Sequence, residues 1–284
     1  MPSALIAGCG YVGAATADLF QAGGWEVEGW THSPESAAAL TAKPYAVRAV
    51  DISDHGAVER AAGGFDVVIH CASSGGGGPD GYRRVYLEGT RNLLQTLRPP
   101  RFIFTSSTSV YAQREGEWVD EESPAEPVQE TGRILRESEE LVRQNGGTMA
   151  RLAGIYGPGR SALLRKLLAG EARIEGDGGR FLNQVHRDDV AAALLRLATL
   201  PNDQVFNVTD DEPITQRAAY EWLALKLDRP VPAATDQAGP RKRGVSNKRV
   251  SNRKLRALGW APRFPTFQSG MEESVLPTLT QAGA

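Results

Sequence analysis

Three glycines near the start of the chain are spaced to hold a phosphate group. Gly8, Gly10 and Gly13 follow the apolar run 4–7 and precede a helix-like stretch at 14–20. In such a strand–turn–helix the first glycine allows the tight turn, the second leaves space for a pyrophosphate, and the third lets the helix pack closely. The N–H groups and the positive dipole end of the helix then face the phosphates. The residues predicted to contact a dinucleotide here are Gly8, Gly10, Tyr11, Val12 and Gly13.

The same glycine spacing makes a prediction about substitution. A side chain added at the second or third glycine should occupy space that the phosphates or the helix need. We therefore expect Gly10→Asp and Gly13→Val to abolish dinucleotide binding in a protein that stays folded.

The end of the second predicted strand, 25–30, bears on which dinucleotide binds. At this place an Asp or Glu would accept the 2′-hydroxyl of NAD, but the chain has Thr31, His32 and Ser33. Two hydroxyls and an imidazole suit a 2′-phosphate better than a bare ribose, although the usual arginine is missing. The cofactor is thus predicted to be NADP or NAD, with NADP slightly favoured. The alternative is an ordinary polar loop that caps a helix starting at Pro34.

Apolar runs alternate with helical patterns through the first half of the chain. The predicted strands are 4–7, 25–30, 46–50, 66–72 and 101–105. This alternation indicates an α/β fold with a doubly wound parallel sheet of the Rossmann type, whose ligand binds at the carboxyl ends of the strands. We predict a dinucleotide-binding domain at 1–155. A smaller C-terminal α/β lobe at 156–284 should bind the substrate, with parts that pack back on the first domain.

The composition argues against several kinds of partner. The 284 residues carry a formal net charge of −2, and the pI is near 6.1. The basic run Pro240–Gly244 is too short to indicate nucleic-acid binding, and no apolar run is long enough to cross a bilayer. Cys9 and Cys71 have neither disulfide nor metal-site spacing. We expect a cytoplasmic monomer or homodimer that acts on a small molecule, with no nucleic-acid, membrane or metal partner.

Further motifs, taken in their order along the chain, resemble a known family. Besides the glycine loop they are Asp51–Ile52, 68–72, 88–94, Ser106–Ser107, Val110–Tyr111, 151–159 and 186–191. The chain resembles the extended short-chain dehydrogenase/reductases of the NAD-dependent epimerase/dehydratase group, and more closely its atypical, shorter members. The resemblance implies that Asp51 and Ile52 contact the adenine. It also implies that Cys71, Ala72 and Ser106 line the cofactor.

The resemblance fails at the catalytic pair. Family members carry a tyrosine and, four residues later, a lysine on one helix; the lysine lowers the pKa of the phenol, which moves a proton during hydride transfer. Thr131 and Leu135 fall at these positions, and Tyr86 falls at that of an asparagine in the preceding helix. A threonine hydroxyl is too weak an acid, and leucine has no charge to offer. The resemblance therefore implies a degenerate proton relay.

Ser107 and Tyr111 are the remaining catalytic candidates. In active relatives the serine at the position of Ser107 binds the substrate oxygen, and Tyr111 lies four residues later. Packing is the alternative role of Tyr111, and it is the family's use of that position. His186 is expected to cap the helix that follows and to border the cleft rather than to act as a base. The charged stretch 136–143 is expected to form a solvated helix face.

Two classes of function remain compatible with the sequence. The first is an NAD(P)-dependent oxidoreductase or epimerase that acts on a small polar or sugar-like molecule. The second is a dinucleotide sensor or partner-binding protein that has lost turnover. The glycine loop supports both classes, whereas Thr131 and Leu135 favour the second.

Overall fold

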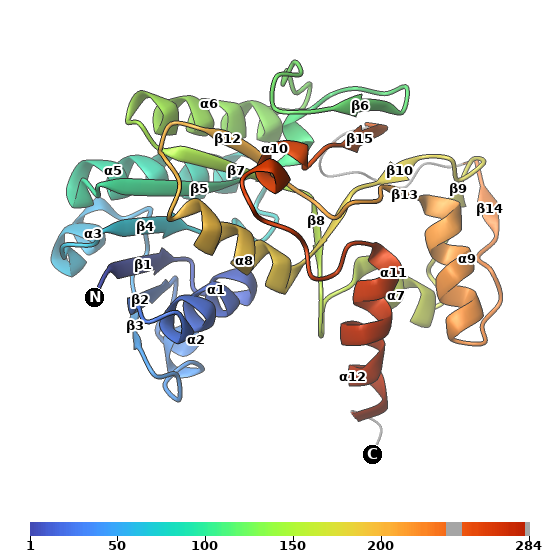
Figure 1. Cartoon of the computed structure of the whole chain (residues 1–284), viewed down its shortest axis with the longest axis horizontal. Helices are drawn as coiled ribbons and strands as arrows, with labels where there is room; N and C mark the ends of the chain where they lie inside the picture. The colour runs from blue at the N-terminus through green and yellow to red at the C-terminus, as the bar shows by residue number, and fades with distance from the viewer. Residues whose placement is uncertain (237–245, 282–284) are drawn as a thin grey trace.

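A parallel sheet forms the centre of the molecule. The computed structural model describes residues 1–236 and 246–281, and within them the central sheet has seven strands in the order β12-β7-β5-β4-β1-β2-β3 (Figure 1). In sequence order the strands are β1 (Ser3–Ala7), β2 (Glu26–Thr31), β3 (Ala46–Ala49), β4 (Val67–His70), β5 (Arg101–Ser107), β7 (Thr148–Leu152) and β12 (Val205–Val208). Every neighbouring pair is parallel. The predicted doubly wound sheet is confirmed.

Helices cover both faces of this sheet. One face carries α1 (Tyr11–Ala22) and α8 (Arg187–Leu197), whose apolar residues share a core with β1 and β4. The other face carries α3 (His55–Ala61), α4 (Gly78–Tyr82), the π-helix η1 (Arg83–Glu88), α5 (Gly89–Leu97) and α6 (Glu130–Gln144). Figure 1 shows α5 and α6 on one side of the strands and α1 and α8 on the other. Because both faces are covered, strands such as β4 are buried at every position rather than at alternate ones.

A smaller lobe lies beside the sheet, on the right of Figure 1. Its core is built around α7 (Ala162–Leu168), α9 (Gln216–Lys226), α11 (Phe267–Gly270) and the π-helix η3 (Met271–Val275), which continues into α12 (Leu276–Gln281). Short two-stranded ladders complete it and join it to the main domain. They pair β8 (Gly154–Tyr156) with β11 (Gln184–His186), β9 (Ile174–Glu175) with β14 (Ala234–Thr235), β10 (Phe181–Leu182) with β13 (Ile214–Thr215), and β6 (Glu117–Val119) with β15 (Lys248–Val250).

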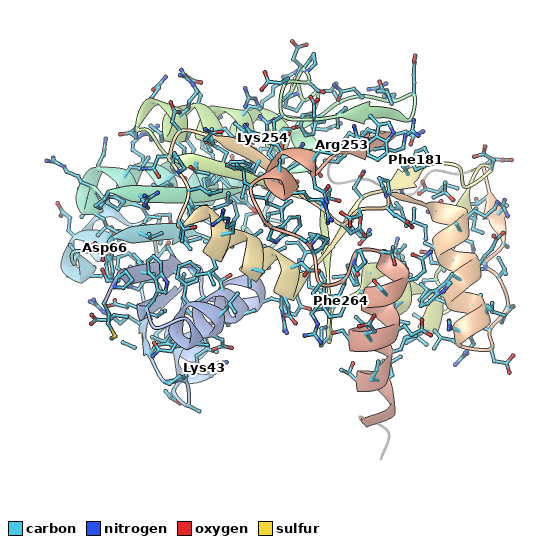
Figure 2. All side chains as sticks on the ribbon, in the orientation of Figure 1. Lys43, Asp66, Phe181, Arg253, Lys254 and Phe264 are labelled. Carbon is cyan, nitrogen blue, oxygen red and sulfur yellow. The ribbon has the colours of Figure 1, made fainter. Side chains whose placement is uncertain are left out.

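Later parts of the chain return to the main domain. α8 packs on α1, and β12 pairs with β7 at the edge of the central sheet, although both come after residue 155. α10 (Arg253–Ala257) follows them, and the Lys254 ammonium lies 4.9 Å from the centroid of the Phe206 ring on β12. Lys254 is labelled above this edge in Figure 2. The basic run Pro240–Gly244 lies outside the described residues.

A buried histidine in β4 makes stability depend on pH. His70 is fully buried; its Nε2 lies 3.1 Å from the carbonyl oxygen of Val85, and its Nδ1 has no hydrogen-bond partner among the described residues. Burial lowers the pKa of His70 from 6.5 to about 4. The pKa of His70 is lower in the folded state than in the unfolded state. The stability that the neutral, buried imidazole contributes is therefore fully present above pH 6.5 and is lost as the pH falls from 6.5 towards 4.

We expect this loss of stability at low pH to be measurable by comparing the parent with a variant that lacks the imidazole. The difference in unfolding free energy between the parent and His70→Gln should shrink by about 1.4 kcal/mol per pH unit below pH 6.5. Urea unfolding at pH 7.0, 6.0 and 5.0 measures it. His186, whose pKa burial also lowers to about 4, is common to both proteins and cancels. A difference that is constant with pH would contradict this assignment.

Candidate functional site

A cavity of about 370 Å³ opens at the carboxyl ends of the central strands. One end is lined by residues 8–12 of the glycine loop, and another by Thr31, His32 and Ser36 after β2. Residues 71–73 after β4 form one wall. The inner end is lined by residues 105–107 of β5, by Leu135 of α6, and by two tyrosines, Tyr82 and Tyr86. The cavity thus joins most of the predicted cofactor residues to Ser107.

The three glycines of the loop have different physical reasons to be glycine. Gly8 has φ +98°, and a Cβ there would lie 2.1 Å from the backbone nitrogen of Ala72. A Cβ on Gly13 would lie 2.1 Å from the carbonyl oxygen of Gly8. A Cβ on Gly10 would meet nothing within 4 Å. The expectation that Gly13→Val leaves the protein folded is therefore wrong, because the added atoms collide with the protein's own backbone.

The space beside Gly10 has the features of a phosphate site. Gly10 precedes α1, whose first-turn N–H groups have no partner within the helix. No acidic residue occupies that first turn. Gly10 lines the cavity and a Cβ on it would meet no neighbouring atom within 4 Å, so the loop has room for the pyrophosphate of a dinucleotide.

Two arginines that the sequence reasoning missed lie beside this phosphate site. The guanidinium carbons of Arg160 and Arg187 lie 5.2 and 5.0 Å from the centroid of the Tyr11 ring, and the Tyr11 hydroxyl donates to the Pro158 carbonyl at 3.0 Å. Arg160 also lines the cavity, whereas Arg187 pairs with Asp188 at 2.9 Å. The only sequence signal was the Gly-Pro-Gly-Arg turn at 157–160, which is far from the glycine loop along the chain.

Arg160 is expected to strengthen dinucleotide binding. A charge-assisted bond to a phosphate is worth roughly 1.5–3 kcal/mol, so Arg160→Ala should weaken binding about 10-fold or more. Arg187→Ala is the matched control, because Arg187 stacks on the same ring but its guanidinium is already paired with Asp188. Calorimetric titration with ADP-ribose, which keeps the pyrophosphate, measures both. An equal loss of ADP-ribose affinity in the two variants would mean that the arginines act by supporting the Tyr11 ring and not by contacting a phosphate.

The loop after β2 caps a helix and also lines the cavity. The Ser33 hydroxyl accepts from the Ser36 N–H at 3.3 Å and so caps α2 (Pro34–Ala38), while Thr31 donates to the Ser33 carbonyl at 3.2 Å. Thr31, His32 and Ser36 line the cavity, whereas Ser33 is not among its lining residues. The alternative of a helix-capping loop is thus confirmed without removing Thr31 and His32 from the site.

Asp51 lies beside this end of the cavity rather than in its lining. Its Oδ1 is 3.6 Å from His32 Nδ1 and accepts from the N–H and hydroxyl of Ser53 at 2.9 and 2.7 Å. Burial raises the pKa of Asp51, but the Ser53 hydrogen bonds outweigh it and lower the pKa below its usual range. Ile52 is buried, and its carbonyl accepts from Asn92 at 2.9 Å. Asp51 therefore brings negative charge close to His32.

The inner end of the cavity contains Ser107 and one of the two residues at the family's catalytic positions. Ser107 lines it, and its hydroxyl accepts from the Ser109 N–H at 3.2 Å. Leu135 lies in the same lining and is only 3% exposed. Thr131, one turn earlier on α6, instead borders a separate small pocket beside Ser109 and Gly132. Of the two residues placed at the family's catalytic positions, one is therefore in the cavity and the other is not.

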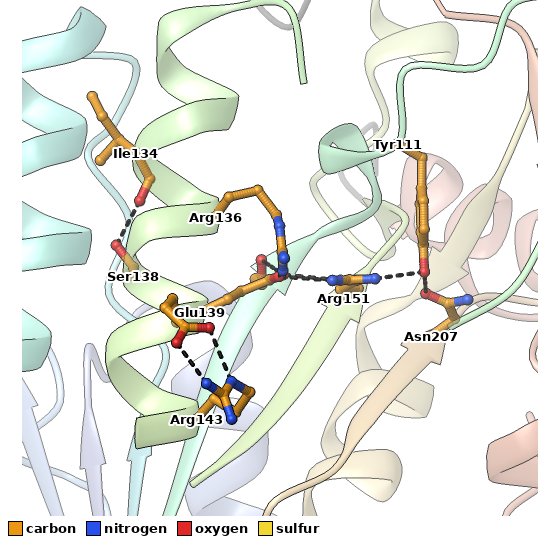
Figure 3. Close-up of polar contacts among 10 residues, drawn as sticks. Tyr111, Ile134, Arg136, Ser138, Glu139, Arg143, Arg151 and Asn207 are labelled. Carbon is orange, nitrogen blue, oxygen red and sulfur yellow. Dashed lines mark hydrogen bonds and ion pairs between the residues drawn. The ribbon is translucent and has the colours of Figure 1, made fainter. Parts of the chain in front are cut away.

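A buried polar network supports β5 and β7 from the side of α6 (Figure 3). Arg151 donates to both carboxylate oxygens of Glu139, at 2.9 and 2.8 Å, and Arg136 also contacts Glu139. The Ser106 hydroxyl donates to Glu139 at 2.6 Å. Burial raises the pKa of Glu139, but its bonds to Arg151 and Ser106 lower the pKa below its usual value. Glu139 is 1% exposed, so the expectation of a solvated helix face at 136–143 is wrong for this residue.

Tyr111 belongs to this network and not to the cavity lining. It is fully buried; its hydroxyl donates to Asn207 Oδ1 at 2.9 Å and accepts from Arg151 at 2.8 Å. The structure therefore does not bring Tyr111 next to Ser107 in the cavity. Its contacts correspond to the packing role that the sequence left as the alternative.

His186 caps α8. Its Nδ1 accepts from the Asp188 N–H at 3.2 Å, and its Nε2 lies 3.0 Å from the Ser274 hydroxyl. The ring is fully buried and packs 4.2 Å from the ring of Phe264, which is labelled in Figure 2. The predicted cap is confirmed, and the ring is absent from the cavity lining.

Both cysteines are free thiols that line the cavity. Among the described residues no group of histidine, cysteine and carboxylate side chains could hold a metal ion, and no helix is long and apolar enough to span a membrane. Burial raises the pKa of Cys9 to about 11 and raises that of Cys71 as well. At neutral pH both thiols are therefore protonated and behave as small apolar groups.

Comparison with known proteins shows the family to which the chain belongs. The family model described as "NAD dependent epimerase/dehydratase family" matches residues 4–209, which include the glycine loop, Ser107 and β12. The chain belongs to the NAD-dependent epimerase/dehydratase family. Protein YeeZ of Escherichia coli strain K12 is 30% identical over 239 residues, which cover 80% of this chain and 84% of YeeZ.

Solved structures of epimerase/dehydratase proteins share the fold. A putative NAD-dependent epimerase/dehydratase from Methylobacillus flagellatus superposes with a TM-score of 0.79 at 28% identity, over 100% of this chain and 99% of that one. UDP-glucose 4-epimerase of Thermus thermophilus, solved in complex with NAD, gives a TM-score of 0.84 at 24% identity over 99% of each chain. At 24% identity, the similarity to the Thermus thermophilus epimerase shows a shared fold only.

Proposed function

We propose that this member of the epimerase/dehydratase family binds NAD or NADP in the cavity and uses it in hydride transfer with a small polar or sugar-like substrate. The observation that carries the proposal is the continuity of the cavity from the glycine loop to Ser107. The loop holds the pyrophosphate, Cys71 and Ala72 line the ribose, and the Ser107 hydroxyl binds the substrate oxygen. When bound, the dinucleotide supplies or accepts the hydride.

Titration of the full chain with both dinucleotides tests the binding step. We expect NADP to bind a few-fold more tightly than NAD, because two hydroxyls and the imidazole of His32 line this end of the cavity, whereas the Asp51 carboxylate lies outside the lining and faces His32 at 3.6 Å. The preference for NADP should shrink in His32→Gln, which removes the imidazole from this end of the cavity. Tighter binding of NAD than of NADP by the parent would contradict the preference and would leave the dinucleotide site intact.

Turnover is tested with a nucleotide sugar as probe. UDP-glucose is added to the NAD-loaded protein, and absorbance at 340 nm reports hydride transfer to the cofactor. Ser107→Ala should lower the rate without changing NAD affinity, because Ser107 lies at the inner end of the cavity, away from the glycine loop. Failure of both dinucleotides to bind would overturn the proposal.

A dinucleotide sensor is the second candidate function. The presence of Leu135 in the cavity favours it, because we infer that Leu135 stands where the family's lysine would lie. A sensor predicts tight binding of NAD or NADP with no turnover of any probe. A change in thermal stability or in association state on binding would be its positive signature.

A further inference from the structure

Two phenols reach the inner end of the cavity from the helical segment before α5. Tyr82 ends α4, and Tyr86 lies in the middle of the π-helix η1. Both line the cavity together with Ser107 and Leu135, and they are 7% and 8% exposed. Neither lies at the family's tyrosine and lysine positions, which fall on the later helix α6. The cavity therefore contains phenolic groups supplied by a different helical segment.

Tyr86 is the more firmly positioned of the two. Its ring lies parallel to that of His70 on β4, with centroids 6.3 Å apart and planes at 14°, and edge-on to Phe104 on β5 at 6.2 Å. The Tyr82 ring packs on it at 4.9 Å. Phe104 and Ser107 belong to the same strand, and η1 packs on α6, which carries Leu135. Rings from two strands thus hold Tyr86 at the end of the cavity that contains Ser107.

The π-helix gives a local reason for this placement. A π-turn adds one residue to the helical turn and so rotates the side chains that follow. Gly89 comes directly after η1, and a Cβ there would lie 2.8 Å from the Ile52 side chain, which lets this segment pack close to the sheet. The backbone of η1 thereby sets which side chain of the segment turns towards the strand ends.

We propose that Tyr86 is the proton donor for reduction of a polarised carbonyl compound in this cavity, an inference that rests on the proposed function. With a reduced nicotinamide bound, hydride delivery to the carbonyl carbon would oxidise the nicotinamide and move the carbonyl π electrons to the oxygen. That oxygen would take the phenolic proton of Tyr86 and accept a hydrogen bond from Ser107. The resulting phenolate would regain its proton from a water molecule, which is left as hydroxide in bulk solvent.

A direct spectroscopic test compares NAD⁺ with NADH. The two share all phosphates, but only NAD⁺ has a positive nicotinamide ring, and a positive charge favours ionisation of a neighbouring phenol. Tyrosinate absorbance at 295 nm, followed against pH in the saturated complexes, should show one phenol ionising about half a pH unit or more lower with NAD⁺ than with NADH. That difference should vanish in Tyr86→Phe and persist in Tyr82→Phe, the matched control from the same cavity.

Nucleotide binding tests the proposed function, whereas the tyrosinate titration tests the role of Tyr86. Tyr86→Phe should bind NAD⁺ within a few-fold of the parent, because the substitution removes one oxygen and keeps the ring stack. If the difference between the NAD⁺ and NADH titrations persists in Tyr86→Phe, or is lost in Tyr82→Phe instead, Tyr86 is not the proton donor. Either result leaves the proposed dinucleotide site intact. Absence of any nucleotide binding removes the assignment together with the proposed function.

Discussion

Gly10→Asp should abolish binding of NAD and NADP, by at least 100-fold, while the melting temperature of the protein without ligand stays within a few degrees of the parent's. A Cβ at this position meets nothing within 4 Å, so the added side chain fits the fold. Gly10 is the N-cap of α1, beside the proposed pyrophosphate site, so the aspartate would place a carboxylate against two phosphate charges. Calorimetric titration and thermal unfolding of the same sample give the two measurements.

Two further glycine variants show whether this effect is specific. Gly10→Ala adds only the Cβ, so it should weaken binding less than the aspartate and also leave the fold intact. Gly13→Ala should instead lower the melting temperature sharply or prevent folding, because its Cβ would lie 2.1 Å from the Gly8 carbonyl oxygen. Full nucleotide affinity in a folded Gly10→Asp protein would place the pyrophosphate elsewhere.

The sequence was sufficient to predict the first five strands of the sheet because each of them has a local pattern. Buried parallel strands are short apolar runs, and each expected run lies in or overlaps an observed strand from β1 to β5. The glycine loop also carries its own geometry, since its spacing matters within a single turn. The return of β12 to the main sheet could not be predicted, since its pairing with β7 joins residues more than fifty positions apart.

The parts of the site that the sequence could not predict depend on contacts between distant segments. Glu139 has the local pattern of an exposed helix face, and only the approach of Arg151 from β7 makes it a buried ion pair. Arg160, in the turn after β8, lies 5.2 Å from the centroid of the Tyr11 ring and lines the same cavity as the glycine loop, a contact between segments far apart in the sequence. Tyr86 has the spacing of a core residue, and its position in a π-helix cannot be foreseen from periodicity.

In a Tyr86→Phe background, which has lost its proposed proton donor, the pair Thr131→Tyr and Leu135→Lys should raise hydride transfer by about 10²–10⁴-fold, which is roughly 3–5 kcal/mol of barrier. Leu135 already lines the cavity, whereas Thr131 lies one turn earlier on α6 and borders the separate small pocket, so the longer tyrosine side chain is needed there to reach the cavity. The lysine lowers the pKa of the new phenol so that the phenol exchanges its proton near neutral pH. The rate of NADPH oxidation with butane-2,3-dione, read at 340 nm, measures the gain.

Three controls decide what a gain would mean. Leu135→Met with Thr131→Phe keeps the size of the new side chains without the acid or the charge, and it should gain nothing. Addition of Tyr86→Phe should remove turnover from the parent and leave most of it in the double variant, because the new phenol takes over the proton transfer. Ordinary rates in the parent that the double variant does not raise would show that the cavity already has a complete, rearranged site. If both proteins bind the cofactor and neither turns over any probe, the sensor function is the better account of Leu135.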